Sequence, residues 1–326
     1  MTRWYKSPLT KEELKSVSAR SDIKGLVQTL GYLMLLVFSA AAALWGFHNL
    51  KLVPALLILL VHGFFYSFML NGFHELSHNT VFKSKGLSRF FYRLFSFLSW
   101  NNHVFFSASH REHHFYTLNS EKDQEVILPI ILTFKEFLLR GIVNPLGFVE
   151  TLWGTLFLAA GRVDGKMYSG LGAFSAEWKK HLFPEEKQEE RKALIAWARV
   201  TVAGHLLILL FCLYFNIPEM IVLVTLAPFY GSGFLYFLNP TQHIGLTGDN
   251  DDHRKNSRTI LLNPFLRFLY WNMNYHIEHH MYAAVPCYNL KKLHKLIEDD
   301  LPPSSKGFIR TWRDIRQLHN KHKSNT

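Results

Sequence analysis

Histidine occurs along this chain in a spacing that favours metal binding. Eight of the 18 histidines fall in three short boxes. The boxes are His74-Glu-Leu-Ser-His78, His110-Arg-Glu-His113-His114 and His276-Ile-Glu-His279-His280. Neutral imidazole suits iron, zinc, copper and nickel, whereas one tetrahedral zinc takes only three or four protein ligands. Because eight ligands are too many for one such ion, the boxes predict a centre that holds more than one metal.

Four apolar segments of the 326-residue chain are long enough to cross a bilayer, which takes about 20 residues. They are residues 25–47, 52–73, 194–215 and 219–238. The first segment starts too deep in the chain and runs too long for a cleaved signal peptide, so we expect it to be retained. The chain is therefore predicted to be a single all-α integral membrane domain, residues 1–326, with four transmembrane helices in two hairpins.

The distribution of the basic residues, which give the chain a net charge of +11, indicates which ends of the predicted hairpins are cytoplasmic. The two short turns that close them carry only one basic residue, Lys51, whereas almost every other Lys and Arg lies at the opposite ends. By the positive-inside rule, the N-terminus, residues 74–193 and residues 239–326 are predicted to be cytoplasmic and to form a helical cap. The membrane would be a bacterial inner membrane or the endoplasmic reticulum. Nucleic-acid binding is not needed to explain the charge, since the chain lacks a basic helix or a set of strands bearing aromatic residues.

Two further apolar stretches lie within the first cytoplasmic region. Residues 126–140 and 141–160 are interrupted by charged residues such as Lys135 and Glu150. We predict that these stretches form interfacial helices lying along the membrane, with a re-entrant pair as the alternative. Residues 161–193 are polar and are predicted to be a cytoplasmic connector.

The predicted topology places all three boxes on the cytoplasmic side. His74 follows the second span directly, and His78 lies one turn later on the same helical face. A lone histidine, His243, follows the fourth span four residues after Asn239, and we predict it to be a ninth ligand. The nine predicted metal ligands are His74, His78, His110, His113, His114, His243, His276, His279 and His280.

The other nine histidines have ordinary interpretations. His62 and His205 lie in the middle of predicted spans, where they are expected to pack or to hydrogen-bond to neighbouring helices. His48 lies in an outer turn, and His103 has no partner at ligand spacing. Polar surface positions are expected for His181, His253, His294, His319 and His322.

Polar residues near the boxes are candidates for positioning the ligands, because carboxylates often fix the tautomer of a metal-bound histidine. The candidate carboxylates are Glu75, Glu112 and Glu278 inside the boxes and Asp123 downstream of the second box. Asn272 lies four residues before His276 and would face the metals if the helix extended that far. We predict that the site residues beside the ligands are Asn239, Asn272, Glu112 and Glu278.

The ordered set HxxxH, HxxHH, NxxxH and HxxHH resembles the membrane fatty acid desaturase and hydroxylase superfamily. The resemblance extends from about the first span to Leu293 and implies two irons held by the boxes on the cytoplasmic face. In stearoyl-type members a lone histidine after the last span also binds metal, and an asparagine four residues earlier holds a metal-bound water; His243 and Asn239 match that pair. The chain has no His-Pro-Gly-Gly haem motif of a fused cytochrome b5. The resemblance therefore implies an electron donor in trans, of the ferredoxin or cytochrome b5 type.

Subgroup resemblances point to more than one kind of substrate. Segments around Asn239, Asn256 and Trp271 are similar to bacterial desaturase-like proteins of the rhizobitoxine and rhizopine type. The first and third boxes are also similar to those of sphingolipid desaturases. A lipid acyl chain and a small polar metabolite therefore both stay open as substrates, because fold-level likeness does not choose between them.

The chemistry that the resemblance implies is an O2-dependent attack on an unactivated C–H bond, which no side chain achieves without a cofactor. A second hydrogen abstraction gives an alkene, whereas hydroxyl rebound gives an alcohol. A barrier difference of about 1.4 kcal/mol changes the ratio of these products about tenfold, so the ligand set is compatible with desaturation and with hydroxylation.

Two other functions fit parts of the sequence. The first box matches the HExxH motif, with Glu75 as general base, and would make the chain an intramembrane zinc metalloprotease using residues 74–78. That interpretation leaves the two H-x-x-H-H boxes without a purpose. A metal carrier or sensor without catalysis is the other alternative, and it would bind metal without consuming O2.

Overall fold

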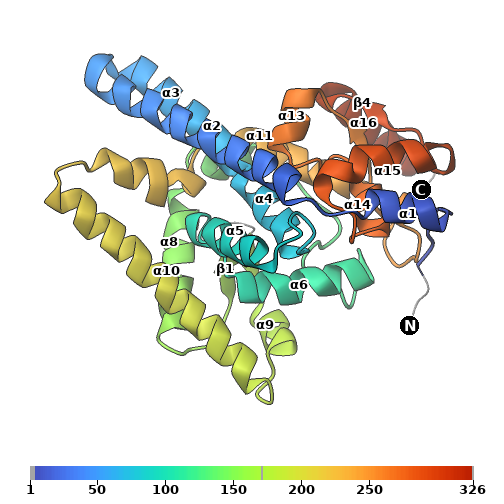
Figure 1. The fold of residues 1–326 in the computed structure, drawn as a ribbon, viewed down its shortest axis with the longest axis horizontal. Helices are drawn as coiled ribbons and strands as arrows, with labels where there is room; N and C mark the ends of the chain where they lie inside the picture. The colour runs from blue at the N-terminus through green and yellow to red at the C-terminus, as the bar shows by residue number, and fades with distance from the viewer. Residues whose placement is uncertain (1–3, 170–171, 325–326) are drawn as a thin grey trace.

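Three long apolar helices dominate one half of the molecule in the computed structural model, which describes residues 4–169 and 172–324 (Figure 1). They are α2 (Asp22–Asn49), the nearly continuous pair α3 (Leu52–Ser67) and α4 (Met69–Ser77), and α10 (Gln188–Tyr214). Among the described residues, these three are long and apolar enough to cross a membrane. α2 and α3 pack as an antiparallel hairpin. Three of the four predicted spans are thus confirmed as membrane-length helices.

The fourth predicted span, residues 219–238, is broken. It consists of a π-helical turn η2 (Ile221–Thr225), a 3₁₀ turn η3 (Ala227–Phe229) and the short helix α11 (Gly233–Leu238). Pro228 has no N–H to continue the helical hydrogen bonds, and Gly231 has a φ of +73°, which ends the helix geometry. A fourth continuous transmembrane helix is therefore not confirmed.

The predicted interfacial helices are also less regular than expected. Residues 126–133 form no helix, and they are followed by α7 (Phe134–Glu136), the π-helical turn η1 (Phe137–Ile142) and α8 (Pro145–Ala159). Asn144 caps α8 by accepting a hydrogen bond from the N–H of Gly147, and α8 packs along α10.

The remaining segments form a cap at one end of the long helices. Its helices are α1 (Lys11–Val17), α5 (Lys85–Leu98), α6 (His103–Tyr116), α9 (Ala176–Leu182), α12 (His253–Asn256), α13 (Pro264–Leu269), α14 (His276–Met281), α15 (Leu290–Ile297) and α16 (Phe308–Ser324), with 3₁₀ turns η4 (Asn239–Gln242), η5 (Cys287–Asn289) and η6 (Glu298–Asp300). Two small sheets complete it: the antiparallel pair β1 (Met167–Ser169) and β2 (Gly172–Phe174), and the parallel pair β3 (Ile260–Leu261) and β4 (Ser305–Lys306). The predicted connector, residues 161–193, thus contains a hairpin and α9.

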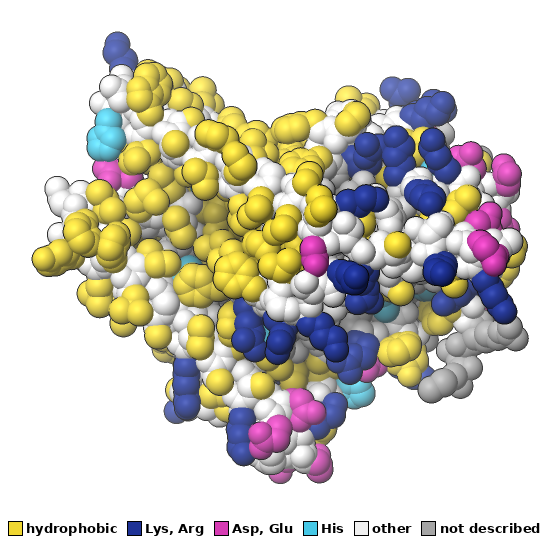
Figure 2. Space-filling model, in the orientation of Figure 1, with side chains coloured by type: hydrophobic (Ala, Val, Ile, Leu, Met, Phe, Trp, Pro, Cys, Tyr) yellow, Lys and Arg dark blue, Asp and Glu magenta, His cyan; other side chains and the backbone are white. Residues whose placement is uncertain are grey.

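Surface composition divides the molecule in the same way. Figure 2 shows apolar side chains covering the half built from α2, α3 and α10, whereas Lys and Arg gather on the cap. Exposed apolar side chains such as Val37, Phe38 and Leu207 are each 65% exposed, which suits a lipid environment rather than water. The chain is therefore an integral membrane protein with a charged cap.

Aromatic packing holds the cap helices in place beneath the long helices. Phe73 of α4 contacts Phe106 of α6, with ring centroids 4.7 Å apart. Phe95 of α5 meets Trp271 edge to face at 5.5 Å, just before α14. These buried contacts tie together the helices that carry the three histidine boxes.

Candidate metal centre

Each histidine box lies on a short, well-fixed piece of helix. His74 and His78 lie one turn apart at the C-terminal end of α4. α6 carries the second box, and its first turn is capped by Asn102, whose side chain accepts from the N–H groups of Val104 and Phe105. The third box is α14 itself, which begins at His276. All three elements present their histidines to one buried space.

The structure brings all nine predicted ligands together in two neighbouring groups. In each group the candidate ligand atoms lie within 4.8 Å of one another. The first group is His74, His78, His110, His114 and His279, and the second is His113, His243, His276 and His280. Each H-x-x-H-H box supplies both groups, so the two groups form one assembly. His243 joins the second group as predicted from its place after Asn239.

Ring nitrogens inside each group face one another at close range. In the second group, Nε2 of His276 lies 2.9 Å from Nε2 of His243 and 3.0 Å from Nε2 of His280. In the first group, Nε2 of His110 lies 3.2 Å from Nε2 of His78 and 3.0 Å from Nε2 of His114.

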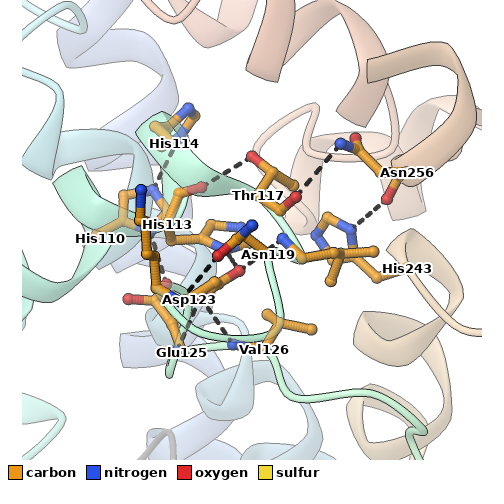
Figure 3. A network of polar contacts seen from close by, with 12 residues as sticks. His110, His113, His114, Thr117, Asn119, Asp123, Glu125, Val126, His243 and Asn256 are labelled. Carbon is orange, nitrogen blue, oxygen red and sulfur yellow. Dashed lines mark hydrogen bonds and ion pairs between the residues drawn. The ribbon is translucent and has the colours of Figure 1, made fainter. Parts of the chain in front are cut away.

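The outer nitrogens of several of these rings are fixed by hydrogen bonds. His110 donates from Nδ1 to Glu125 over 2.7 Å, and His113 donates from Nδ1 to Asp123 over 2.8 Å (Figure 3). His243 donates from Nδ1 to the backbone oxygen of Asn256 over 2.8 Å. A neutral imidazole that donates from Nδ1 carries a lone pair on Nε2, so these contacts aim lone pairs into the centre.

Thr117 fixes His280 in the same way. Its hydroxyl donates to the backbone oxygen of His113 over 2.8 Å, which leaves its lone pairs to accept from Nδ1 of His280 at 3.2 Å. Nε2 of His280 then also carries a lone pair. Lone pairs of His243 and His280 that converge beside His276 repel one another unless a cation lies between them.

The residues present fit a metal centre on two further observations. Nδ1 and Nε2 of His279, Nδ1 of His74 and Nδ1 of His276 are buried without a hydrogen-bond partner in the described part of the chain. Burial lowers the pKa of His243 to about 3, and burial lowers the pKa values of His276, His279 and His280 well below their ordinary range. These rings are therefore neutral at pH 7, the form that binds metal.

Glu75 lies behind the ligands rather than in front of them. Its carboxylate is buried, and Oε1 is 3.4 Å from Nδ1 of His74 and 3.3 Å from Nδ1 of His279. It thus lies between one histidine of the first box and one of the third, on the side of their Nδ1 atoms. A zinc peptidase needs this glutamate beside the metal-bound water, so the position of Glu75 does not favour the HExxH alternative.

Three of the residues expected at or near the centre occupy other environments. Glu112 is partly buried on the face of α6 opposite His110, and within the described residues no hydrogen bond joins it to a ligand. Glu278 is fully buried but accepts from Thr259 and His294, away from the ligands. Asn272 lies in a turn with a φ of +58°, because α14 begins only at His276 and no helix carries it toward the centre. Asp123 and Asn239, by contrast, lie where the sequence predicted.

Two histidines predicted at the surface are in fact structural. His253 is buried and stacks on Trp4, with ring centroids 4.1 Å apart. His294 pairs with Glu278; burial lowers its pKa, but the contact with Glu278 outweighs that effect and raises it. The prediction of surface positions was wrong for both, because α12 and α15 fold back onto α14. The mid-span histidines behave as expected: His62 contacts Ser39 at 2.8 Å, and His205 contacts Thr225 at 3.1 Å.

Sequence reasoning missed three residues that hold ligands. Thr117 directly follows α6 and contacts His280, and Glu125 lies in the irregular loop after it and contacts His110. Asn256 contacts His243 through its backbone oxygen alone. The acidic pair Asp123-x-Glu125 after the second box was the available signal for Glu125. Burial raises the pKa of Glu125 to about 7, although the charge of His113 and the hydroxyl of Ser109 lower it in part.

A cavity of about 540 Å³ reaches the centre from one side. Members of both histidine groups line its inner end, and Asn71, Asn239 and Met273 lie beside them. The inner-end histidines are His74, His110, His113, His243 and His276. Asn71 donates to Oδ1 of Asn239 at 3.3 Å, which fixes Asn239 on the same cavity wall as the histidines. A substrate in this cavity would therefore meet both groups.

Comparison with known families gives one match, which covers most of the chain. The family described as "Fatty acid desaturase" matches residues 49–312. The matched range contains the three boxes, Asn239 and His243, which are the residues that the structure gathers at the centre. No curated protein matches the chain.

Proposed function

Because the chain belongs to the fatty acid desaturase family, we propose that it is an O2-dependent di-iron oxidoreductase that desaturates or hydroxylates an unactivated C–H position. The observation that carries the proposal is the assembly of nine histidines, seven buried and two half-buried, into two adjoining groups. One ion needs no more than six ligands, so nine converging imidazoles suit two ions. Imidazole is a ligand that iron accepts, which agrees with the family.

The proposed ligand sets follow the two groups. His74, His78, His110, His114 and His279 would hold one iron, and His113, His243, His276 and His280 the other. When bound, the irons supply with O2 and two electrons the oxidising power that side chains lack. The electrons are proposed to come from a separate protein of the ferredoxin or cytochrome b5 type.

The protein's own residues orient the ligands and the substrate. Glu125 and Asp123 accept hydrogen bonds from the outer nitrogens of His110 and His113, so these two rings are oriented before metal binds. The cavity presents the substrate to both groups and buries the reacting position. Asn239 lies on this wall and is proposed to hold water or substrate oxygen at the centre.

The proposed orientation places the centre, the cap and both termini on the cytoplasmic side, as the positive-inside rule requires. The concentration of Lys and Arg on the cap supports it (Figure 2). The substrate is proposed to be a lipid acyl chain rather than a small metabolite, because the cavity adjoins the apolar surface of η1 and α8.

The test is product formation by purified protein with iron, a ferredoxin or cytochrome b5 donor system and an acyl lipid. We expect O2 uptake coupled to an alkene or an alcohol, which mass spectrometry separates by a loss of two hydrogens or a gain of one oxygen. His113→Ala and His279→Ala should each abolish the product while the protein still inserts in the membrane. Full product formation by both variants would contradict the proposal. Absence of product, together with a proteolytic activity that Glu75→Gln abolishes and His279→Ala does not change, would favour the zinc peptidase instead.

A further inference from the structure

Two charged side chains lie at the exposed end of the cavity that leads to the histidines. Arg140 of η1 and Glu150 of α8 both line the cavity, and their side chains are 43% and 30% exposed. Nη1 of Arg140 lies 3.9 Å from Oε2 of Glu150. The histidines at the other end of the cavity are buried, so this pair marks its mouth.

The surroundings of the mouth are apolar and face outward. Between Phe137 and Ala159, the sequence contains no charged residue other than Arg140 and Glu150. Its exposed apolar side chains include Leu139, Val143, Leu146, Val149 and Trp153, each more than half exposed. Charged residues in lipid-facing segments are costly; where they occur they pair with each other, face a cavity and mark a substrate path.

The backbone holds Arg140 rigidly on one side of the mouth. It lies in a π-helical turn, a geometry often found at functional sites, and its backbone oxygen accepts from the hydroxyl of Ser232 at 3.0 Å. Gly141 packs against Gly233 so closely that a Cβ atom at Gly141 would lie 3.0 Å from the Cα of Gly233. This contact fixes η1 to α11.

The other side of the mouth is equally fixed. Asn144 donates its backbone N–H to the oxygen of Phe229 at 2.7 Å, and its side chain caps α8. Glu150 therefore projects from a helix whose start is anchored to the same segment that forms the cavity wall. The two charges are pre-positioned by the fold rather than by the weak attraction between them.

We propose that the substrate is a membrane amphiphile whose polar end offers an adjacent hydrogen-bond acceptor and donor, bound by Arg140 and Glu150 respectively, while its chain runs inward to the histidines. The inference rests on the proposed function and narrows its substrate class. Arginine donates to a phosphate or carbonyl oxygen, and the carboxylate accepts from an ammonium, amide or hydroxyl group. A free fatty acid offers only acceptors and would place a second negative charge beside Glu150.

Two kinds of lipid share this donor–acceptor chemistry. An N-acyl amino alcohol offers an amide carbonyl with neighbouring N–H and hydroxyl donors. An ethanolamine phospholipid offers a phosphate with a neighbouring ammonium. Both can diffuse to the mouth within the bilayer, whereas a water-soluble metabolite would not need an apolar approach.

The test is equilibrium binding to the purified iron-containing protein in detergent, with radiolabelled N-hexadecanoylethanolamine, dipalmitoylphosphatidylethanolamine, hexadecanoic acid and methyl hexadecanoate. We expect one or both donor–acceptor lipids to bind at least about tenfold more tightly than the acid and the ester, since one good polar contact is worth about that factor. Which of the two binds identifies the headgroup. Equal binding of all four probes, or tightest binding of the acid, would overturn the proposal without any variant.

Variants then assign the preference to the pair. Arg140→Gln and Glu150→Gln should each remove the preference for the donor–acceptor lipids over the ester. The matched control is Arg162→Gln, because Arg162 stacks on Phe157 outside the cavity, and this variant should keep the preference. An undiminished preference in both pair variants would overturn the proposal. Iron content measured on the same samples separates this inference from the proposed function. Protein that contains iron but shows no headgroup preference refutes only the inference. Protein that lacks iron but shows a headgroup preference refutes only the di-iron centre.

Discussion

His113 donates the proton on Nδ1 to the carboxylate of Asp123 across 2.8 Å, and both side chains are buried. The same carboxylate accepts from the backbone N–H groups of Leu118 and Glu125, so it cannot rotate away. Burial alone would lower the pKa of His113, but the charge and hydrogen bond of Asp123 raise it. A loop residue thus fixes the ring of a histidine from the second box.

Replacing Asp123 with Asn should weaken iron binding about 10- to 100-fold, since the charge that orients His113 is lost while the side-chain shape is kept. Competition with a chelator measures the change. Glu121→Gln, on the exposed part of the same loop, is the control and should match the unaltered protein. An iron affinity of Asp123→Asn equal to that of the control would contradict the assigned role.

His243 and His253 are both buried near His280, yet only His243 belongs to a ligand group. His243→Ala removes one of four ligands from the second group and should leave about one iron per chain, held by the first group. His253→Ala should keep both irons, because that ring stacks on Trp4 instead. Elemental analysis of the two variants side by side gives the answer. Equal iron contents for the two variants would remove His243 from the ligand set.

The break in the segment 219–238 fits against α3 through two glycines. A Cβ atom at Gly63 would lie 2.5 Å from the backbone oxygen of Tyr230, and one at Gly231 would lie 2.5 Å from the backbone of Gly63. Gly63→Ala should therefore destabilise the protein by about 1–3 kcal/mol through overpacking. Thermal unfolding in detergent checks this, with Gly86→Ala, which meets no atom within 4 Å, as the neutral control. An unchanged unfolding temperature for Gly63→Ala would mean that the break is not packed as described.

The stability of the iron-free protein should fall as the pH decreases below 6.5, the ordinary pKa of histidine. Burial lowers the pKa values of nine histidines outside the membrane spans: His78, His103, His110, His114, His243, His253, His276, His279 and His280. The unfolded chain binds more protons than the folded one in that range. The free energy of unfolding therefore becomes smaller as the pH is lowered. The raised pKa values of Glu125, His113 and His294 act in the opposite sense but are fewer.

Calorimetry or fluorescence of the iron-free protein in detergent measures this effect. We expect a nearly constant unfolding temperature between about pH 7 and 8 and a progressive fall below pH 6.5, as the lowered pKa values require. A rise in unfolding temperature on acidification would show that the raised groups dominate.

The histidines that the structure brings together could be singled out from the sequence because metal binding imposes a residue type at a fixed spacing. Imidazoles at i, i+3 and i+4 share one helical face, and this holds wherever the helix is placed. His243 followed from its position after an apolar segment. Long apolar runs with at most one charged residue predicted α2, α3 and α10 for the same reason: each is a local pattern that needs no knowledge of its neighbours.

The features that were missed depend on contacts between distant segments. Asn256 holds His243 through a backbone oxygen, which any residue type could supply. His253 is buried and His294 is half-buried because α12 and α15 pack against α14, and composition gives no sign of that packing. Pro228 and Gly231 were visible in the sequence as helix-breaking residues, but the apolar content of 219–238 outweighed them in the prediction.

Metal content per chain of the purified, iron-supplemented protein tests the di-iron centre most directly. The nine-histidine assembly predicts about two irons per chain, and substitution of one ligand in any of the three boxes, such as His78→Ala, His113→Ala or His279→Ala, should lower that number. One tightly held zinc per chain that is unaffected by His279→Ala would contradict the di-iron centre. It would instead favour a zinc peptidase that uses the HExxH motif at residues 74–78.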